Sequence, residues 1–553
     1  TLFLFFVIFI GLSCKKELDV KNPNDPNISL NVVDEGGLAK YATGVVYFDG
    51  FNDGVDWLGD SYFSLPRGYG EIMAEVLHGG AGSNNQVNTI GAPDKIILSP
   101  GGTTLTNPSP QIKIIRDFNN RAATSQGNNA LYYQWLAMYA LNYGCNSVLE
   151  IVDNISFTGD KLSKQNTVKA WCNWWKGYAY AQIGTLYYAG LINNSTKSKS
   201  NKFVSYKDMI AESNKFYNAA LANLNAITSE ADYNSLIKLI IPSVCQVGKG
   251  LPPTKDMWIR NINTMLARNI ILNKISPFVN GVSGGTIQKS VMDPITTADW
   301  TAIKNYCTNG IKSTDYVFTG RAPSTNYFFS PQSGSCNANA TGSVSSTTLK
   351  ISERITQDFN LGDKRYINNF DTAVSRPTYA GSGINANTTQ SLLDGGRNIA
   401  GVVFYGSQTA LELELYIAGT YEENELMLAE ANINLGSIPD GITSLNNVKN
   451  FQGAGLQLSG SFTKNQALAE LTKERRVALM FRGLSFYDMR RWGWSYSIAN
   501  GGGRYGCVAY DGSTKYTNAT FDYNYMDYWD VPGDELELNA PGTGSFAVKN
   551  PNY

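Results

Sequence analysis

The sequence predicts a mainly α-helical protein, in which pairs of helices form a scaffold that carries long loops. In segments such as 131–153, 168–188 and 418–435, apolar residues recur every three or four positions, as they do on one face of a helix. Stretches rich in Gly, Asn, Ser and Thr separate these segments. With 553 residues, the chain is also long enough to bury a large core.

Capping patterns mark the start of two of the predicted helices. Ser205 with Asp208, and Thr463 with Gln466, each place a hydroxyl three positions before an acceptor side chain, which is the pattern of a capping box. Thr296 or Thr297 can cap another helix, and Gly436 is suited to end one. In chain order, the predicted helices cover 131–153, 168–188, 205–224, 258–274, 296–311, 418–435 and 463–481.

Short turns between neighbouring helices predict antiparallel pairs similar to tetratricopeptide repeats, although no consensus repeat period is visible. The intervening loops are longer than ordinary connections, and their aromatic residues favour functional loops over disordered ones. We therefore expect a helical scaffold with long ligand-binding loops. These loops cover 79–110, 275–296, 320–350, 371–410 and 498–545.

The N-terminus has the features of an export signal. Residues 2–12 form an unbroken apolar run that is too short to span a bilayer but fits the core of a signal peptide. Ser13-Cys14 follows, a loose match to the site where bacterial lipoproteins are cleaved and acylated. We expect a signal peptide over 1–13, truncated at its start, and a lipid on Cys14 followed by a tether over 14–27. An ordinary cleaved signal with an incidental cysteine is the alternative.

Composition and motifs argue against several classes of function. A net charge of −1 disfavours a nucleic-acid partner, which would require a basic face. The only histidine is His78, so multi-histidine metal sites are excluded, and no phosphate-binding or nucleophile motif is present. We expect neither a cofactor nor a metal. A partial match to a calcium loop over 49–60 lacks the usual ligands at two positions.

The six cysteines after Cys14 are scattered and lack zinc-ligand spacing. Cys145 and Cys172 lie in helical patterns, where buried thiols are expected, with disulfides as the alternative.

Two aromatic clusters are candidates for ligand binding. Aromatic faces can stack on sugar rings while neighbouring charged and amide groups bind hydroxyls. For any one of these rings, packing of a loop against the scaffold is an equally good interpretation. The first cluster lies near acidic residues and Arg67, His78 follows it, and the second lies in the loop 320–350. The candidates are Trp57, Tyr62, Phe63, Tyr69, His78, Tyr327, Phe328 and Phe329.

The C-terminal third contains a recognisable pattern. Residues 474–493, ERRVALMFRGLSFYDMRRWG, resemble the E-R-R-x-E-L-x-F-E-G-x-R-x-x-D-L-R-R-W-G signature of the SusD/RagB family. Residues 427–432 are similar to that family's Y-A-E-A-x-N helix, and residues 531–539 and 550–553 to its ending. The chain departs from the signature at Ala478 and Arg482, where acidic residues are usual, and at Leu484 and Ser485, where basic or aromatic residues are usual.

These motif residues are expected to be structural. Arginine and carboxylate side chains at this density predict buried charge pairs that connect the last helices. We expect Glu430 and Asn432 to cap turns or to bridge to these pairs. The motif residues are Glu430, Asn432, Glu474, Arg475, Arg490, Arg491 and Trp492.

The resemblance implies a SusD-like fold and a function. Such proteins are outer-membrane lipoproteins of Bacteroidetes that capture oligosaccharides, or in some cases peptides, above a SusC-like TonB-dependent transporter. It would make residues 28–553 one SusD-like domain, with an N-terminal part over about 28–275 and a C-terminal part over about 297–553. A peptide-binding protein of the same fold is the first alternative, and a glycoside hydrolase the second. The family's ligand residues are variable loop aromatics, so the motif transfers none of them.

The lipid anchor can be tested by substitution. Cys14→Ala removes the thiol that would be acylated, so the protein should move from the membrane fraction to the soluble fraction. Immunoblots of fractionated cells measure this. Unchanged membrane association would contradict the prediction.

Overall fold

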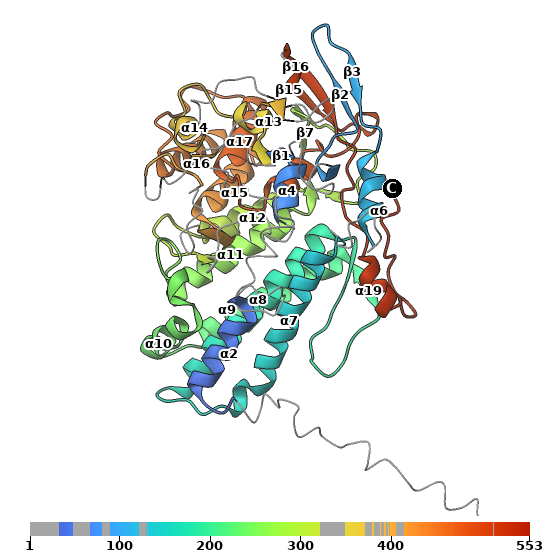
Figure 1. Cartoon of the computed structure of the whole chain (residues 1–553). Coiled ribbons are helices and arrows are strands. Elements are labelled where there is room, and N and C mark those ends of the chain that lie inside the picture. Colours follow the sequence, from blue (N-terminus) through green and yellow to red (C-terminus); the bar gives the residue numbers. More distant parts are fainter. Residues whose placement is uncertain are drawn as a thin grey trace, which may run out of the picture.

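The fold is described from a computed structural model, whose described residues are 32–47, 67–79, 89–120, 129, 131–320, 349–370, 379–380, 387–388, 392–393, 396, 399–404, 414–512 and 514–553. Figure 1 shows long helices side by side in the lower half and strands gathered at the top. The predicted mainly α-helical fold is therefore confirmed. The predicted division between the N- and C-terminal parts stays a prediction.

The N-terminal helices pack as a layer of neighbours. α8 packs against α7 and α9, α2 packs against α7 and α10, and α11 packs against α9. These contacts are those expected of paired antiparallel helices joined by short connections. The helices are α2 (Glu35–Tyr47), α7 (Tyr132–Ile151), α8 (Lys161–Leu186), α9 (Tyr206–Asn225), α10 (Glu230–Ile240) and α11 (Lys255–Ile271).

The C-terminal helices continue this stack. α12 packs against α11 and α15, and α15 packs against α16 and α17. The helices are α12 (Thr297–Thr308), α15 (Tyr421–Asn434), α16 (Ile438–Phe451), α17 (Lys464–Ala478) and α18 (Ser485–Arg491). Shorter helices are α4 (Gly68–Met73), α6 (Gln111–Phe118), α13 (Glu353–Thr356), α14 (Lys364–Asn369) and α19 (Gly533–Leu538).

The capping patterns predict the first residues of three helices correctly. Complete capping boxes form at Ser205, Thr296 and Thr463, so α9, α12 and α17 begin where the sequence predicts. α8 begins earlier than predicted because Asp160, outside the apolar stripe, accepts hydrogen bonds from the backbone of Leu162 and Ser163. Caps are therefore better boundary signals here than periodicity.

Two segments predicted as loops contribute to a sheet, which corrects the prediction. The antiparallel sheet β15-β16-β2-β3 joins residues from 79–110 to residues from 498–545. The two inner strands are far apart in sequence, so no local pattern marks their pairing. The strands are β2 (Lys95–Ile97), β3 (Thr104–Thr106), β15 (Arg504–Asp511) and β16 (Thr514–Asp522).

Short strand pairs fix the remaining connections. β1 (Leu77–Gly79) pairs with β11 (Leu349–Ile351), and β10 (Phe318–Gly320) pairs with β14 (Leu415–Ala418), both antiparallel. The other pairs are β4 (Ala189–Leu191) with β5 (Phe203–Ser205), β6 (Lys274–Ile275) with β9 (Asp293–Pro294), β7 (Phe278–Val279) with β8 (Val282–Ser283), and β12 (Tyr379–Ala380) with β13 (Asn387–Thr388).

Aromatic residues fill the core between the scaffold and these strands. Trp171, Trp174 and Trp175 of α8 are all buried. The ring of Phe318, from β10, lies 4.7 Å from Trp174 and 5.6 Å from Trp258 of α11. Much of the chain's high aromatic content is therefore structural.

Most charged side chains of the C-terminal motif are buried and paired, as predicted. Arg491 donates to both carboxylate oxygens of Glu430, each at 2.7 Å, and to Asp488 at 2.7 Å. Asp488 also accepts from Arg475 at 2.9 Å. These bonds connect α15, α17 and α18, and Trp492 is buried directly after them.

Glu474 extends the same network. Its carboxylate accepts from Arg365 at 2.6 and 2.9 Å and lies 2.6 Å from the Lys449 ammonium.

Two motif residues differ from the prediction. Arg490 donates to the backbone carbonyls of Thr185, Leu272 and Asp527 instead of a carboxylate. Asn432 is buried, and its amide oxygen has no hydrogen-bond partner among the described residues.

Cys145 and Cys172 are buried thiols, as predicted, and the other described cysteines share this state. Cys145, Cys172, Cys245, Cys307 and Cys507 are buried and not in disulfides. Within the described residues, no helix is both long and apolar enough to span a membrane.

The Glu430–Arg491 pair should matter strongly for stability. Glu430→Gln leaves the buried guanidinium with one carboxylate partner, and breaking a buried pair costs about 3–5 kcal/mol. Urea unfolding followed by circular dichroism measures the loss. As a control, Lys207→Ala removes a bridge to Asp293 whose side chains are both about half exposed, and should cost less than about 1 kcal/mol because water screens it. Equal losses in the two variants would contradict this account.

Candidate functional site

Most of the predicted ligand residues lie outside the described residues. These are Trp57, Tyr62, Phe63, Tyr327, Phe328 and Phe329. The predicted lipid site Cys14 and the calcium-like stretch 49–60 lie outside them as well. What the structure describes is how the ends of these segments are held.

The other two candidates lie inside the protein. Tyr69, in α4, has 0% of its surface exposed, so its ring offers no face to a ligand in this structure. His78, in β1, is 7% exposed and faces Lys350 across the strand pair. Tyr69 therefore packs in the core, which is the alternative to ligand stacking that the sequence left open.

The described residues that flank the two aromatic clusters are held on one strand. Arg67, which follows segment 48–66, donates to the carbonyl of Tyr416 in β14 at 2.8 Å. Thr319 and Gly320, which precede segment 321–348, pair with Tyr416 and Leu415 of the same strand. β11, which follows segment 321–348, pairs with β1. Neither connection is visible in the sequence, because the partners are far apart along the chain.

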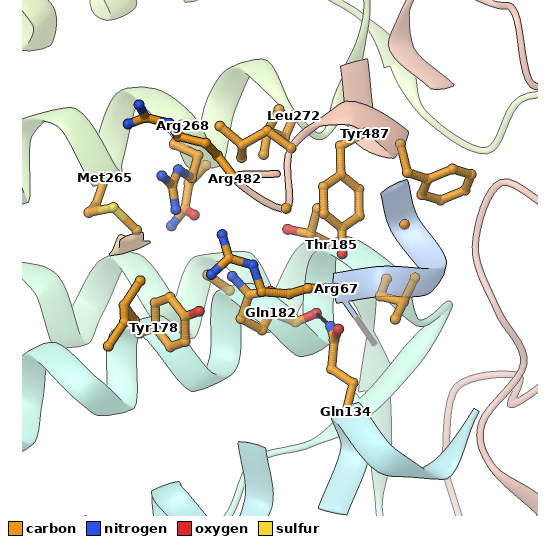
Figure 2. Close-up of a pocket in the computed structure, with 18 of the residues that line it drawn as sticks. Arg67, Gln134, Tyr178, Gln182, Thr185, Met265, Arg268, Leu272, Arg482 and Tyr487 are labelled. Atoms are coloured by element: carbon orange, nitrogen blue, oxygen red, sulfur yellow. Dashed lines mark hydrogen bonds between the residues drawn. The ribbon is translucent and has the colours of Figure 1, made fainter. Parts of the chain in front are cut away.

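A small cavity lies behind this anchor (Figure 2). Arg67, Arg268 and Arg482 come from three different segments and line it together with Tyr178 and Gln182. Its volume of about 40 Å³ has room for only a few water molecules. We therefore exclude it as a pocket for a sugar or peptide.

A larger cleft opens on the other side of Arg482, and we call it the basal cleft. It has a volume of about 370 Å³, and β14, α15, α16 and the segment 399–403 contribute to its walls. Its polar and aromatic lining consists of Lys249, Glu414, Tyr416, Glu422, Phe451, Gln452 and Arg482.

The charged groups of the basal cleft are coupled. Arg482 and Gln452 each donate to Glu422 at 3.2 Å. Burial alone would raise the pKa of Glu422, but the charges of Arg482 and Lys249, with backbone and Gln452 hydrogen bonds, lower it from 4.5 to about 2. Burial lowers the pKa of the Lys249 ammonium, against the attraction of Glu422. The cleft therefore presents fixed charges of both signs at neutral pH.

Two aromatic rings position these cations. The guanidinium of Arg482 lies 4.2 Å from the centre of the Tyr416 ring, and the Lys249 ammonium lies 3.9 Å from the centre of Phe451. One oxygen of Glu422 and one terminal nitrogen of Arg482 are buried without a hydrogen-bond partner among the described residues. Buried polar groups normally have a partner, so these two atoms stand out among the charged groups of the cleft.

The sequence did not identify the residues of this cleft. Arg482 did stand out as a departure from the SusD/RagB signature, and the structure explains it through Glu422. Lys249, Tyr416 and Glu422 carry no motif. No cluster of three or more His, Cys, Asp or Glu suited to a metal occurs within the described ranges.

Glu422 predicts a distinct dependence of stability on pH. The pKa of Glu422 is lowered in the folded protein, so its ionised carboxylate contributes to the free energy of unfolding. This contribution is complete above pH 4.5 and is lost as the pH falls towards 2. Glu422→Gln should therefore be less stable than wild type at neutral pH by about 3 kcal/mol, and the gap should close over that window. Urea unfolding at several pH values measures the gap.

Glu425, on the same helix, is a matched control. Burial raises its pKa, so Glu425→Gln should be no less stable than wild type at neutral pH. A gap for Glu422→Gln that stays constant from pH 7 to 2 would contradict the charge coupling.

Comparison with known proteins follows the C-terminal motif. Residues 423–553 match the model of the SusD family. No curated protein matches the chain.

Solved structures resemble the whole chain. A SusD homologue from Bacteroides thetaiotaomicron is 13% identical, with 92% of this chain and 98% of that chain covered and a TM-score of 0.54. The surface glycan-binding protein A from Bacteroides uniformis is 11% identical over 92% and 98%, with a TM-score of 0.53. A structure with a xylogluco-oligosaccharide is 15% identical over 92% and 99%, with a TM-score of 0.52.

At sequence identities this low, structural similarity shows only that the folds are alike. The shared fold agrees with the predicted SusD-like architecture. The family match adds the sequence pattern of the C-terminal part. The C-terminal part of the chain, residues 423–553, therefore matches the SusD family, and the chain as a whole has a SusD-like fold.

Proposed function

We propose that this protein captures oligosaccharides at the cell surface and passes them to a SusC-like TonB-dependent transporter in the outer membrane. A lipid on Cys14 would hold it to that membrane. Trp57, Tyr62, Phe63, Tyr327, Phe328 and Phe329 would supply the ring-stacking faces.

One observation carries the proposal. Arg67 and Gly320 adjoin the two aromatic-rich segments, and both are held on β14, which lines the basal cleft. The described residue that follows the first segment and the one that precedes the second thus meet the same strand. This shared contact supports a single binding face instead of two unrelated loops.

The chemistry of the basal cleft suits saccharide hydroxyls. Each hydroxyl both donates and accepts, and the cleft offers a carboxylate, a guanidinium, an ammonium and an amide side by side. The similar structures named for glycan binding, or solved with an oligosaccharide, favour a glycan over a peptide as the first ligand to test.

The charge state of Glu422 argues against its serving as the general acid of a hydrolase in this cleft. A glycosidase needs one carboxylic acid that stays protonated near neutral pH, which requires a raised pKa. Glu422 has a pKa of about 2 and is held ionised by Arg482 and Lys249. We therefore propose binding without catalysis.

A binding screen with soluble protein starting after the tether tests the proposal. Trp57→Ala and Tyr327→Ala should each weaken binding of the same glycan by about 1–3 kcal/mol, because each removes a stacking face. Isothermal titration calorimetry measures the loss, and Trp57→Phe, which keeps a ring, should lose less.

Other outcomes separate the alternatives. Binding of peptides but of no glycan would favour the peptide-binding protein of the same fold. Release of reducing sugar by the purified protein would favour the hydrolase. Wild-type affinity in both alanine variants would remove these clusters from the site.

A further inference from the structure

A second cleft, separate from the basal cleft, lies between α17, the β7–β8 hairpin and the start of β15. We call it the Trp494 cleft. It has a volume of about 230 Å³ and shares no lining residue with the basal cleft. Its lining includes Gln357, Asn465, Lys473, Trp492, Trp494 and Tyr505.

The two tryptophans are brought together by the glycine between them. Gly493 has a φ of +82°, and a Cβ there would lie 2.7 Å from Val279 and 2.8 Å from Ile287. The tight turn sets the rings of Trp492 and Trp494 5.2 Å apart, inclined at 57°. Trp492 is buried, whereas Trp494 is half-buried at the cleft.

Tyr505 supplies an exposed ring to the same cleft. It is 53% exposed and lies in an irregular part of β15, where the pairing with β16 shifts between Arg504 and Cys507. Gly506, with a φ of +68°, permits this bulge. Bulges redirect side chains and are frequent beside functional sites.

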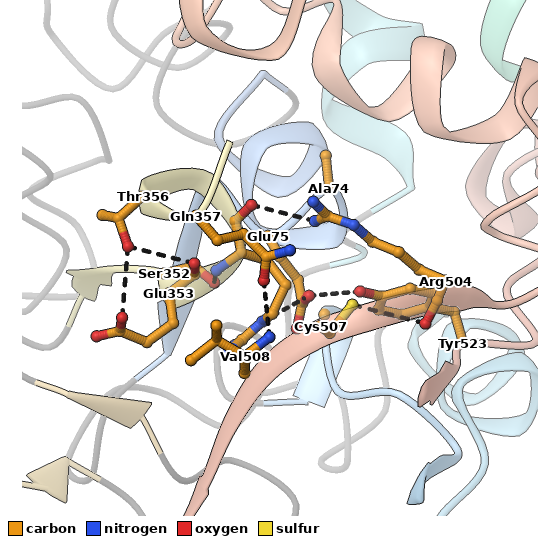
Figure 3. A network of polar contacts seen from close by, with 12 residues as sticks. Ala74, Glu75, Ser352, Glu353, Thr356, Gln357, Arg504, Cys507, Val508 and Tyr523 are labelled. Atoms are coloured by element: carbon orange, nitrogen blue, oxygen red, sulfur yellow. Dashed lines mark hydrogen bonds and ion pairs between the residues drawn. The ribbon is translucent and has the colours of Figure 1, made fainter. Parts of the chain in front are cut away.

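The bulge is held in place by a dedicated side chain. Gln357 donates to the carbonyl of Gly506 at 3.3 Å and accepts from the backbone N–H of Val508 at 2.8 Å, the bond drawn in Figure 3. Fixing both sides of the bulge keeps the Tyr505 ring at the cleft.

Buried ion pairs make the floor rigid. Asp358 accepts from Arg504 at 2.7 and 3.0 Å and from Arg476 at 2.6 Å. The Arg504 guanidinium also lies 4.4 Å from the centre of the Trp494 ring. The neighbouring contacts of Glu75 and Tyr523 continue this polar network beneath the sheet (Figure 3).

The rim provides exposed polar groups beside the aromatic ones. Asn465 is exposed at the start of α17, and the Lys473 side chain, paired with Glu470, is 43% exposed two turns further along. A rigid aromatic wall with amide and ammonium groups at its edge is the arrangement that holds one face of a sugar ring and its hydroxyls.

We propose that the Trp494 cleft is a second saccharide-binding site, which takes one pyranose ring of a longer glycan against Tyr505 and Trp494. This inference rests on the proposed glycan-binding function and adds a second contact point to it. A polysaccharide that reaches both clefts gains affinity through effective concentration, whereas a short oligosaccharide uses one cleft at a time.

Native gel electrophoresis through soluble polysaccharides tests the proposal, with xyloglucan, starch, laminarin and mannan as probes. For a polysaccharide that retards the wild type, Tyr505→Ala should raise the dissociation constant about tenfold. Tyr505→Phe keeps the ring, so its dissociation constant should stay close to that of wild type. Tyr143→Ala is the matched control, because Tyr143 is 55% exposed and lies on α7, a helix that contributes no residue to the Trp494 cleft. It should bind as wild type does.

The outcomes distinguish the two proposals. If wild type binds a polysaccharide and Tyr505→Ala binds it equally well, the second site is overturned and the proposed function stands. If Trp57→Ala binds normally while Tyr505→Ala does not, the second site stands and the proposed loop site is overturned. If wild type binds none of the probes, both proposals fail. Thermal melting of each variant confirms that it is folded.

Discussion

The buried pairing of Arg491 with Glu430 and Asp488 is the constraint on which the rest of the C-terminal structure depends. It fixes α18 against α15, and Arg475 extends the bond to α17. The turn before α18 carries Arg482, which lines the basal cleft, and the turn after it carries Trp492 and Trp494. One ion-paired helix thus positions the walls of both clefts, although none of its paired side chains reaches either one.

Such a network is maintained at an energetic cost, because each charge has lost its hydration. The pairs do not by themselves make the fold more stable than apolar residues would. What they impose is geometry, since a guanidinium that is shared between Glu430 and Asp488 tolerates few arrangements of three helices. For the proposed binding function, this rigidity keeps the clefts open without a ligand, so that less ordering is needed when one binds.

The sequence was informative wherever the determining interaction is local. Capping boxes at Ser205, Thr296 and Thr463 gave helix starts correctly, because donor and acceptor lie three residues apart. The sheet that joins β2 to β16 was missed, because its pairing spans most of the chain. The basal cleft was missed for the same reason. Of its residues only Arg482 gave a signal, as a departure from a family pattern whose compensation by Glu422 only the fold reveals.

Aromatic residues show most clearly why composition could not place the site. Trp171, Trp174 and Trp175 are as prominent in the sequence as any ligand residue, yet all three are buried in the core. Tyr69 belonged to a promising cluster and is buried as well, whereas Tyr505 lay unnoticed in a stretch predicted as loop. What distinguishes Tyr505 is a bulge held by Gln357, more than a hundred residues away. A ring becomes a candidate for binding through the backbone that exposes it, and that backbone is set by contacts distant in sequence.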